Sequence, residues 1–152
     1  MASYGILAVD CEVCNLNALE RTFRRGYHFF SATNSEDALA ILEQNDIALI
    51  ISDHRTPGMD GVEFLKRASQ KHPDTIRMIL TAYIEERLLL NAMDMGYIYK
   101  CIAKPWKPEE VKAIVETALK PGSNAEIYEK NTGLVKRQVP LFMQWFEFAA
   151  TG

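Results

Sequence analysis

The chain has no long apolar run: no segment approaches the roughly 20 apolar residues that a membrane-spanning helix requires. It begins without the basic flank and apolar segment of a signal peptide, so the sequence predicts a cytoplasmic protein with no membrane partner. An excess of positive charge is also missing, since 17 Lys and Arg residues stand against 20 Asp and Glu residues. Surfaces that bind nucleic acids are usually basic, and we therefore expect no direct nucleic-acid contact.

Cysteine is scarce, with three residues at positions 11, 14 and 101. This number is odd, and a chain of 152 residues can bury a sufficient core without covalent cross-links. A fold stapled by disulfides is therefore not expected.

Apolar segments of strand length alternate five times with segments of helical periodicity. The strand-like segments are 5–9, 27–32, 47–52, 77–80 and 97–103, and the helical ones are 16–23, 38–42, 62–68, 88–95 and 111–119. Thr33 and Glu36 are spaced as a capping box before the second helix, and Pro108 suits the start of the fifth. Five such units with right-handed crossovers predict an α/β fold, a flavodoxin-like doubly wound parallel sheet of strand order 2-1-3-4-5.

Polar residues follow several of the predicted strands. Asp10 and Asp53 end the first and third strands, Thr81 follows the fourth, and Lys104-Pro105 follows the fifth. The carboxyl ends of parallel strands line the ligand crevice of such sheets. A carboxylate nucleophile, a cation and a hydroxyl donor are the groups that phosphoryl transfer to an aspartate requires.

These residues resemble the receiver domain of bacterial two-component response regulators, the CheY-like superfamily. The resemblance covers about residues 4 to 120 and includes the loop Pro57-Gly58-Met59-Asp60-Gly61 behind Asp53. Residues 51–58 and 103–106 are most similar to receivers that precede HD-type phosphodiesterase domains or hydrogenase-type transcription regulators. We interpret Asp60 and Glu63, at the start of the third helix, as structural acids.

The resemblance implies a phosphoacceptor signalling switch in a histidine-to-aspartate phosphorelay. The chain would not be an enzyme, apart from catalysis of its own phosphorylation and dephosphorylation. Asp53 would accept the phosphoryl group from a sensor histidine kinase or phosphotransfer protein. Lys104, in a cis peptide bond with Pro105, would pair with the phosphoryl charge, and Thr81 and Ala82 would bind its oxygens.

The resemblance also implies magnesium, held by Asp10, Asp53 and the backbone carbonyl of Arg55. The family pattern has two neighbouring acids after the first strand, and Cys11 stands in place of the second. A thiol is a poor ligand for a hard, oxygen-seeking cation. Three outcomes stay open: direct ligation by Asp10, a contribution from Glu12, or weak metal binding with poor phosphorylation. We expect weakened but surviving affinity.

Cys11 is also the best evidence for the main alternative, a pseudo-receiver that binds partners without being phosphorylated. A redox pair is a further hypothesis, because Cys11 and Cys14 have the C-x-x-C spacing at a strand-to-helix junction. Acidic surroundings disfavour a thiolate, and we expect Cys14 to be an inward-facing residue of the first helix. A phosphatase with an aspartyl nucleophile would need a second acid where Arg55 stands, so this activity is not expected.

Phosphorylation would draw Thr81 inward and vacate space for a side chain of the fifth strand. Receivers commonly have an aromatic residue three positions before the lysine, where Cys101 stands here, and Tyr99 is the other switch candidate. For the tyrosines of this strand, packing at the sheet edge is favoured over a switch role. We expect contacts with a downstream effector protein or domain on the face of the fourth helix, fifth strand and fifth helix.

The sequence predicts a receiver domain over residues 1–120 and a C-terminal extension over residues 121–152. The Pro-Gly-Ser-Asn segment 121–124 marks the break. The extension is too short for another ordinary domain, and its segment 141–148 is unusually apolar for a terminus. Exposed apolar patches often mark interaction surfaces, so docking or homodimerisation is weighed evenly against packing back on the domain.

Overall fold

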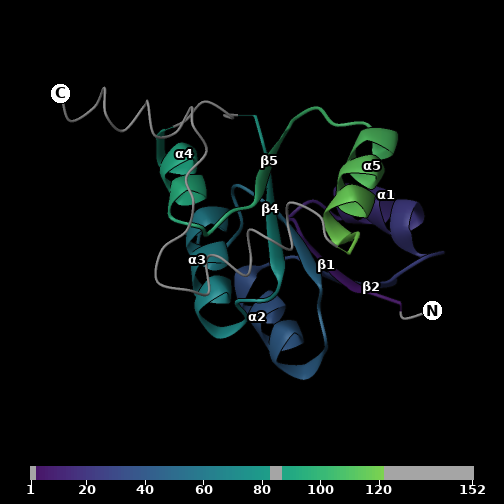
Figure 1. Cartoon of the computed structure of the whole chain (residues 1–152), viewed down its shortest axis with the longest axis horizontal. Coiled ribbons are helices and arrows are strands. Elements are labelled where there is room, and N and C mark those ends of the chain that lie inside the picture. The colour runs from purple at the N-terminus through teal and green to yellow at the C-terminus, as the bar shows by residue number, and fades with distance from the viewer. Residues whose placement is uncertain (1–2, 83–86, 122–152) are drawn as a thin grey trace.

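A five-stranded parallel sheet lies at the centre of the chain, with helices on both faces (Figure 1). The computed structural model describes residues 3–82 and 87–121. The sheet order is β2-β1-β3-β4-β5, which confirms the predicted flavodoxin-like doubly wound fold. The strands are β1 Gly5–Val9, β2 His28–Ala32, β3 Leu49–Asp53, β4 Ile76–Thr81 and β5 Lys100–Ala103; the helices are α1 Val13–Phe23, α2 Ser35–Gln44, α3 Gly61–Lys71, α4 Arg87–Asp94 and α5 Pro108–Leu119.

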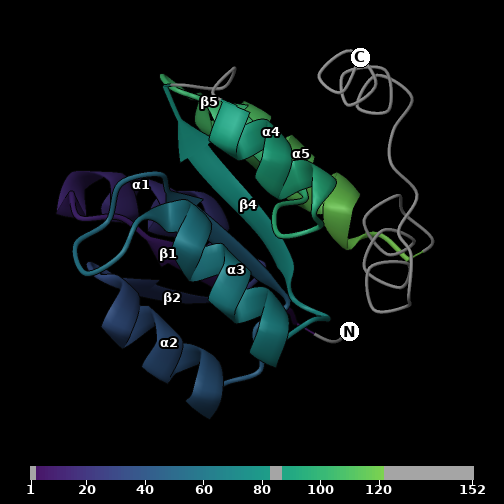
Figure 2. The ribbon, with the colours of Figure 1, turned by 90° about the vertical axis from the view of Figure 1, so that its left-hand side faces the viewer.

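The two faces of the sheet carry two apolar layers. Helices α2, α3 and α4 cover one face, and α1 and α5 cover the other (Figure 1 and Figure 2). Leu7 and Ile50 of the central strands point into the first layer, whereas Ile6 and Ile51 point into the second. Strands buried on both faces have continuous apolar sequences, which is why β1 and β3 were recognisable as short apolar runs.

The start of α2 differs from the prediction by one residue. Thr33 and Glu36 do not form the capping box, because the N-cap is Asn34, whose side chain accepts a hydrogen bond from the Asp37 backbone N–H at 2.8 Å. Asn is a stronger N-cap than Thr. The Asn34 amide also donates to the Asp37 carboxylate at 2.9 Å, which adds a second bond to this cap.

The starts of α3 and α5 agree with the prediction. Asp60 is the N-cap of α3 and accepts a hydrogen bond from the Glu63 backbone N–H at 2.8 Å, so its role is structural. Glu63 in the first turn also pairs with Arg67 at 3.4 Å. Pro108 is the first residue of α5, where its missing N–H removes no helical hydrogen bond.

The fifth strand is shorter than predicted, since β5 begins at Lys100 and not at Tyr97. The Arg77 side chain on β4, which is 1% exposed, bonds this part of the chain. Its guanidinium donates to the carbonyl oxygens of Tyr97 at 2.9 Å and Gly96 at 3.1 Å. A side chain thus supplies the hydrogen bonds that these two carbonyls accept before β5 begins. Arg77 also donates to the Thr75 carbonyl at 2.5 Å. It thereby joins the loop after α4 to the turn before β4.

The predicted C-terminal extension lies almost entirely outside the described residues, which end at Pro121. Its role in docking or dimerisation, and the domain boundary at residue 120, stay predictions. Within residues 3–82 and 87–121, no helix has the length and apolar character needed to span a membrane.

Candidate functional site

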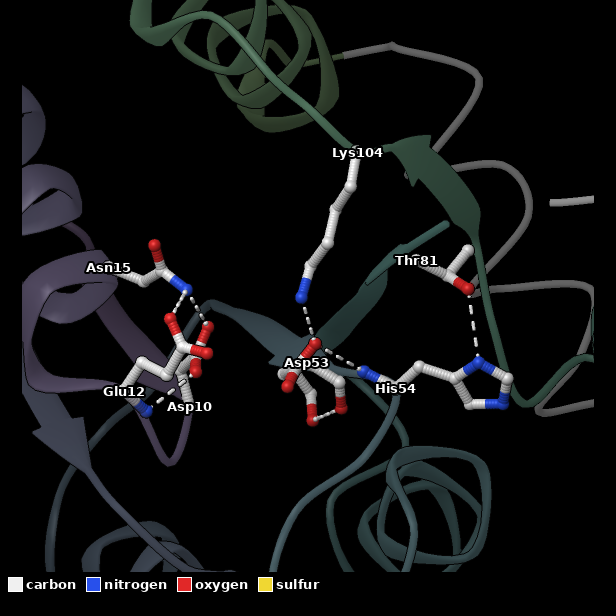
Figure 3. A network of polar contacts seen from close by, with 8 residues as sticks. Asp10, Glu12, Asn15, Asp53, His54, Thr81 and Lys104 are labelled. Carbon is white, nitrogen blue, oxygen red and sulfur yellow. Dashed lines mark hydrogen bonds and ion pairs between the residues drawn. The ribbon is translucent and has the colours of Figure 1, made fainter. Parts of the chain in front are cut away.

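Four polar residues stand at the carboxyl ends of the strands and meet at one rim of the sheet (Figure 3). Asp53 and Thr81 are the last residues of β3 and β4, Asp10 follows β1, and Lys104 follows β5. The register of β3, β4 and β5 aligns these ends. The convergence follows from the strand order, because parallel strands end at the same edge.

The Asp53 carboxylate is paired with the Lys104 ammonium, whose Nζ donates to Asp53 Oδ1 (Figure 3). Asp53 is 8% exposed, so water screens this pair only weakly. The Lys104 backbone N–H donates to the Thr81 carbonyl at 2.9 Å, and the Lys104–Pro105 peptide bond is cis. The ammonium is therefore placed to neutralise negative charge that develops at Asp53.

Asp10 is a second carboxylate in the site and is only 1% exposed. Its Oδ1 accepts a hydrogen bond from the Glu12 backbone N–H at 2.9 Å, and its Oδ2 accepts one from Asn15 Nδ2 at 3.0 Å. Burial raises the pKa of Asp10, and the neighbouring Asp53 carboxylate raises it further, although the Glu12 amide, Asn15 and Lys104 act in the opposite direction. Holding Asp10 ionised thus costs free energy that a bound cation would offset.

A possible metal site consists of Asp10, Cys11 and Asp53. One ligand atom from each of these residues lies within 4.8 Å of the others. Two carboxylates in such a group suit a hard divalent cation, whereas the thiol does not. In the described part of the chain Glu12 is outside this group, and its carboxylate instead accepts a bond of 3.5 Å from Asn15. The two carboxylates therefore fit magnesium, whereas the Cys11 thiol is a soft ligand beside them.

The loop after β3 is tightly held behind the phosphoacceptor candidate. The Gly61 N–H donates to the His54 carbonyl at 2.7 Å, and Thr56 Oγ1 donates to the Met59 carbonyl at 2.6 Å. A Cβ at Gly61 would lie 2.3 Å from the Asp53 carbonyl oxygen, so only glycine fits there. The exposed Arg55, whose carbonyl is a predicted magnesium ligand, lies within this loop.

Thr81 contacts His54, a residue that was not among the predicted site residues. Its hydroxyl oxygen lies 3.0 Å from His54 Nδ1, and both side chains are buried (Figure 3). The only sequence signal was the position of His54 directly after Asp53. Ala82, the other predicted phosphate-binding residue, is exposed next to Thr81.

The exposure of the cysteines corrects one prediction. Cys14 is exposed and not inward-facing. The buried face of α1 includes Leu16 and Leu19, and a residue two positions before Leu16 is turned by about 200° around the helix. Cys101 is buried on β5, where its Sγ lies 3.6 Å from Met93 Sδ.

We expect alkylation to separate these cysteines. Burial raises the pKa of the Cys101 thiol from 9.0 to about 11, whereas Cys11 and Cys14 are exposed. Iodoacetamide at about pH 8 should add two groups to the folded chain and a third only after denaturation, as measured by intact mass. Simultaneous modification of all three would contradict the buried state of Cys101.

The raised pKa of Cys101 also predicts how stability depends on pH. The free energy of unfolding should be unaffected by ionisation of this thiol below pH 9.0 and should fall as the pH rises toward 11, because the thiol then loses its proton more readily in the unfolded chain than when it is buried.

The two tyrosines before β5 are packing residues that precede the strand and are not part of it. Tyr99 packs on the layer of α1 and α5, and burial raises its pKa. Tyr97 packs on the opposite layer, with Lys66 Nζ 5.7 Å from its ring centre. These positions agree with packing at the sheet edge, while a switch role for Tyr99 or Cys101 stays a prediction.

Comparison with known sequences points to one family. The family model of the response regulator receiver domain matches residues 6–116. Hydrogenase transcriptional regulatory protein HoxA of Bradyrhizobium diazoefficiens is 36% identical over 114 residues, which are 75% of this chain and 24% of HoxA. Sporulation initiation phosphotransferase F of Bacillus subtilis is 32% identical over 125 residues, which are 82% of this chain and 100% of that protein. The chain thus spans about a quarter of the length of HoxA.

Solved structures with the same fold include two with more than a quarter of their residues identical. The signal receiver domain of an HD domain-containing protein from Pseudomonas fluorescens Pf-5 is 27% identical, with a TM-score of 0.72 over 86% of this chain and 91% of that one. An uncharacterized protein from Neptuniibacter caesariensis is 34% identical, with a TM-score of 0.70 over 74% and 84%. Similarity to a hydrogenase regulator and to the receiver of an HD domain-containing protein agrees with the resemblance predicted from residues 51–58 and 103–106.

Proposed function

Because the chain belongs to the response regulator receiver domains, which are phosphoacceptor switches of two-component systems, we propose that Asp53 is its phosphoacceptor. The observation that carries this assignment is the contact between Lys104 Nζ and Asp53 Oδ1 at the rim where β1, β3, β4 and β5 end. The domain is a signalling module and not a classical enzyme. Catalysis of its own phosphorylation and dephosphorylation is part of the proposal.

The chemistry follows from the contacts of the Asp53 carboxylate. Among the described residues, the Lys104 ammonium and the His54 backbone N–H both donate to Oδ1 of Asp53. Its Oδ2 is therefore available to attack phosphorus. As the new O–P bond forms, the bond to the donor breaks and its electron pair leaves with the donor group. Lys104 balances the charge of the product, and Thr81 and Ala82 bind the phosphoryl oxygens.

The experiment that tests this proposal is incubation of the full chain with acetyl phosphate and magnesium. We expect an increase in intact mass that corresponds to one phosphoryl group, and peptide mapping after borohydride reduction should place it at Asp53. Absence of the adduct, or its location on another acid, would refute the assignment.

Magnesium is the proposed cofactor, as receiver domains generally bind it. Asp10, Asp53 and the backbone carbonyl of Arg55 would hold the ion, which would reduce repulsion between the incoming phosphoryl group and the carboxylates. The raised pKa of Asp10 supports a cation in this place. Cys11 weakens the site, because its thiol occupies a position next to two oxygen donors.

Replacing Cys11 with aspartate should raise magnesium affinity by at least about tenfold, since even outer ligand changes alter metal affinity by roughly 10- to 100-fold. Magnesium titration followed by the fluorescence of Trp106, which adjoins Lys104-Pro105, measures the effect. Cys14→Asp is the matched control, because Cys14 is exposed and lies outside the metal group. Equal affinities for Cys11→Asp and wild type would show that Cys11 is not at the metal.

The proposed partners are a sensor histidine kinase or phosphotransfer protein and a downstream effector. Receiver domains in general interact with kinases and effector domains. Relatives named as transcriptional regulatory proteins support such an effector and a cytoplasmic location. The exposed Leu88 of α4 and the exposed Met95, which directly follows α4, support the predicted contact face of α4, β5 and α5. No observation favours the pseudo-receiver alternative.

A further inference from the structure

His54 contacts both Asp53 and Thr81. Its backbone N–H donates to Asp53 Oδ1 at 3.0 Å and also reaches the Leu80 carbonyl at 3.0 Å. Its ring nitrogen Nδ1 lies 3.0 Å from the Thr81 hydroxyl oxygen. His54 is 8% exposed and Thr81 is 1% exposed, so this polar contact is shielded from water.

The position of the His54 backbone is fixed from both sides. Its carbonyl accepts the Gly61 N–H at 2.7 Å, and a Cβ at Gly61 would approach the His54 Cα to 3.1 Å. The imidazole therefore has a defined place from which to hold Thr81. Figure 3 shows the Thr81 hydroxyl directed at this ring, which lies on the side of Asp53 away from Asp10.

The hydroxyl of Thr81 points to His54 and forms no hydrogen bond with Asp53 in the described part of the chain. To bind a phosphoryl oxygen on Asp53, Thr81 must turn its oxygen toward that carboxylate. This turn breaks the bond to Nδ1 whichever of the two atoms carries the hydrogen. The turn therefore costs one buried hydrogen bond, which is unfavourable.

We propose that His54 is a positioning residue that holds Thr81 in its resting orientation. It thereby sets the equilibrium between this resting form and the active form, in which the Thr81 hydroxyl is turned toward Asp53. The inference rests on the proposed function, because it assigns Thr81 to the phosphoryl group of Asp53. A residue that stabilises only the resting form lowers the apparent affinity for any ligand of the active form. Loss of the contact should therefore make the active form easier to reach.

Three substitutions of His54 test the contact. His54→Phe keeps the ring but removes both nitrogens. His54→Asn places an amide atom near the position of Nδ1, and His54→Gln places one near Nε2. If the contact through Nδ1 matters, Asn should retain it while Phe and Gln lose it.

Beryllofluoride with magnesium, a phosphoryl mimic, serves as the probe for the full chain. The half-saturating concentration should fall by about tenfold for His54→Phe and His54→Gln, the order expected for loss of one buried hydrogen bond, and should stay near wild type for His54→Asn. The Thr81 methyl resonance in NMR spectra without the probe should shift for the first two variants only.

The outcomes separate the two proposals. If the wild type does not bind beryllofluoride at Asp53, the proposed function fails and the inference with it. If the wild type binds but the three variants match it, or all three change equally, the inference alone is wrong. Should His54→Phe not fold, the difference between the Asn and Gln variants decides.

Discussion

Replacing Asp53 with asparagine is expected to abolish phosphorylation by acetyl phosphate completely. The amide has no anionic oxygen to attack phosphorus, and no other carboxylate in the described site is paired with the Lys104 ammonium. Asn is almost isosteric with Asp and can still accept the hydrogen bonds from Lys104 and the His54 N–H. Loss of the mass increase, with an unchanged circular dichroism spectrum, is therefore the predicted result.

The matched control for this change is Asp60→Asn. Asp60 is exposed, caps α3 and lies in the loop behind the site, and Asn is an equally good N-cap. This variant should be phosphorylated as the wild type is. A phosphoryl adduct that persists in Asp53→Asn but disappears in Asp60→Asn would mean that the phosphoacceptor has been misassigned.

Replacing Arg77 with methionine is expected to lower the free energy of unfolding by about 3 kcal/mol, because several buried backbone carbonyls lose a charged donor. Arg77 is 1% exposed and donates to the carbonyls of Thr75, Gly96 and Tyr97 at 2.5–3.1 Å. Methionine fills part of the volume but cannot satisfy these oxygens. Urea unfolding followed by circular dichroism measures the change.

Arg67→Met is the control for this substitution. Arg67 lies on α3, where its side chain is 56% exposed and pairs with Glu63 at 3.4 Å. Exposed pairs of this kind contribute roughly 0 to 1 kcal/mol, so the control should unfold close to the wild-type midpoint. Equal destabilisation by both substitutions would show that the Arg77 contacts are not what stabilises these loops.

Most of the fold was predictable because its signals are local. The central strands are buried on both faces, so residues 5–9 and 47–52 are continuous apolar runs that end at a carboxylate. Helix starts were less certain, since Thr33 and Asn34 are neighbouring candidates for one cap and only the backbone conformation at Asn34 selects between them. The predicted orientation of Cys14 was wrong because Leu16 and Leu19 define the buried face of α1, and Cys14 lies on the opposite side of that helix.

The positions of Asp10, Asp53, Thr81 and Lys104 followed from the sequence, because a parallel sheet brings the ends of successive strands to one edge whatever the details of packing. The partner of each side chain did not follow. The bonds from His54 to Thr81 and from Arg77 to the Tyr97 carbonyl join residues that are 27 and 20 positions apart. No periodic pattern records such pairs, since they depend on how the loops settle against the sheet, and only the tertiary structure decided them.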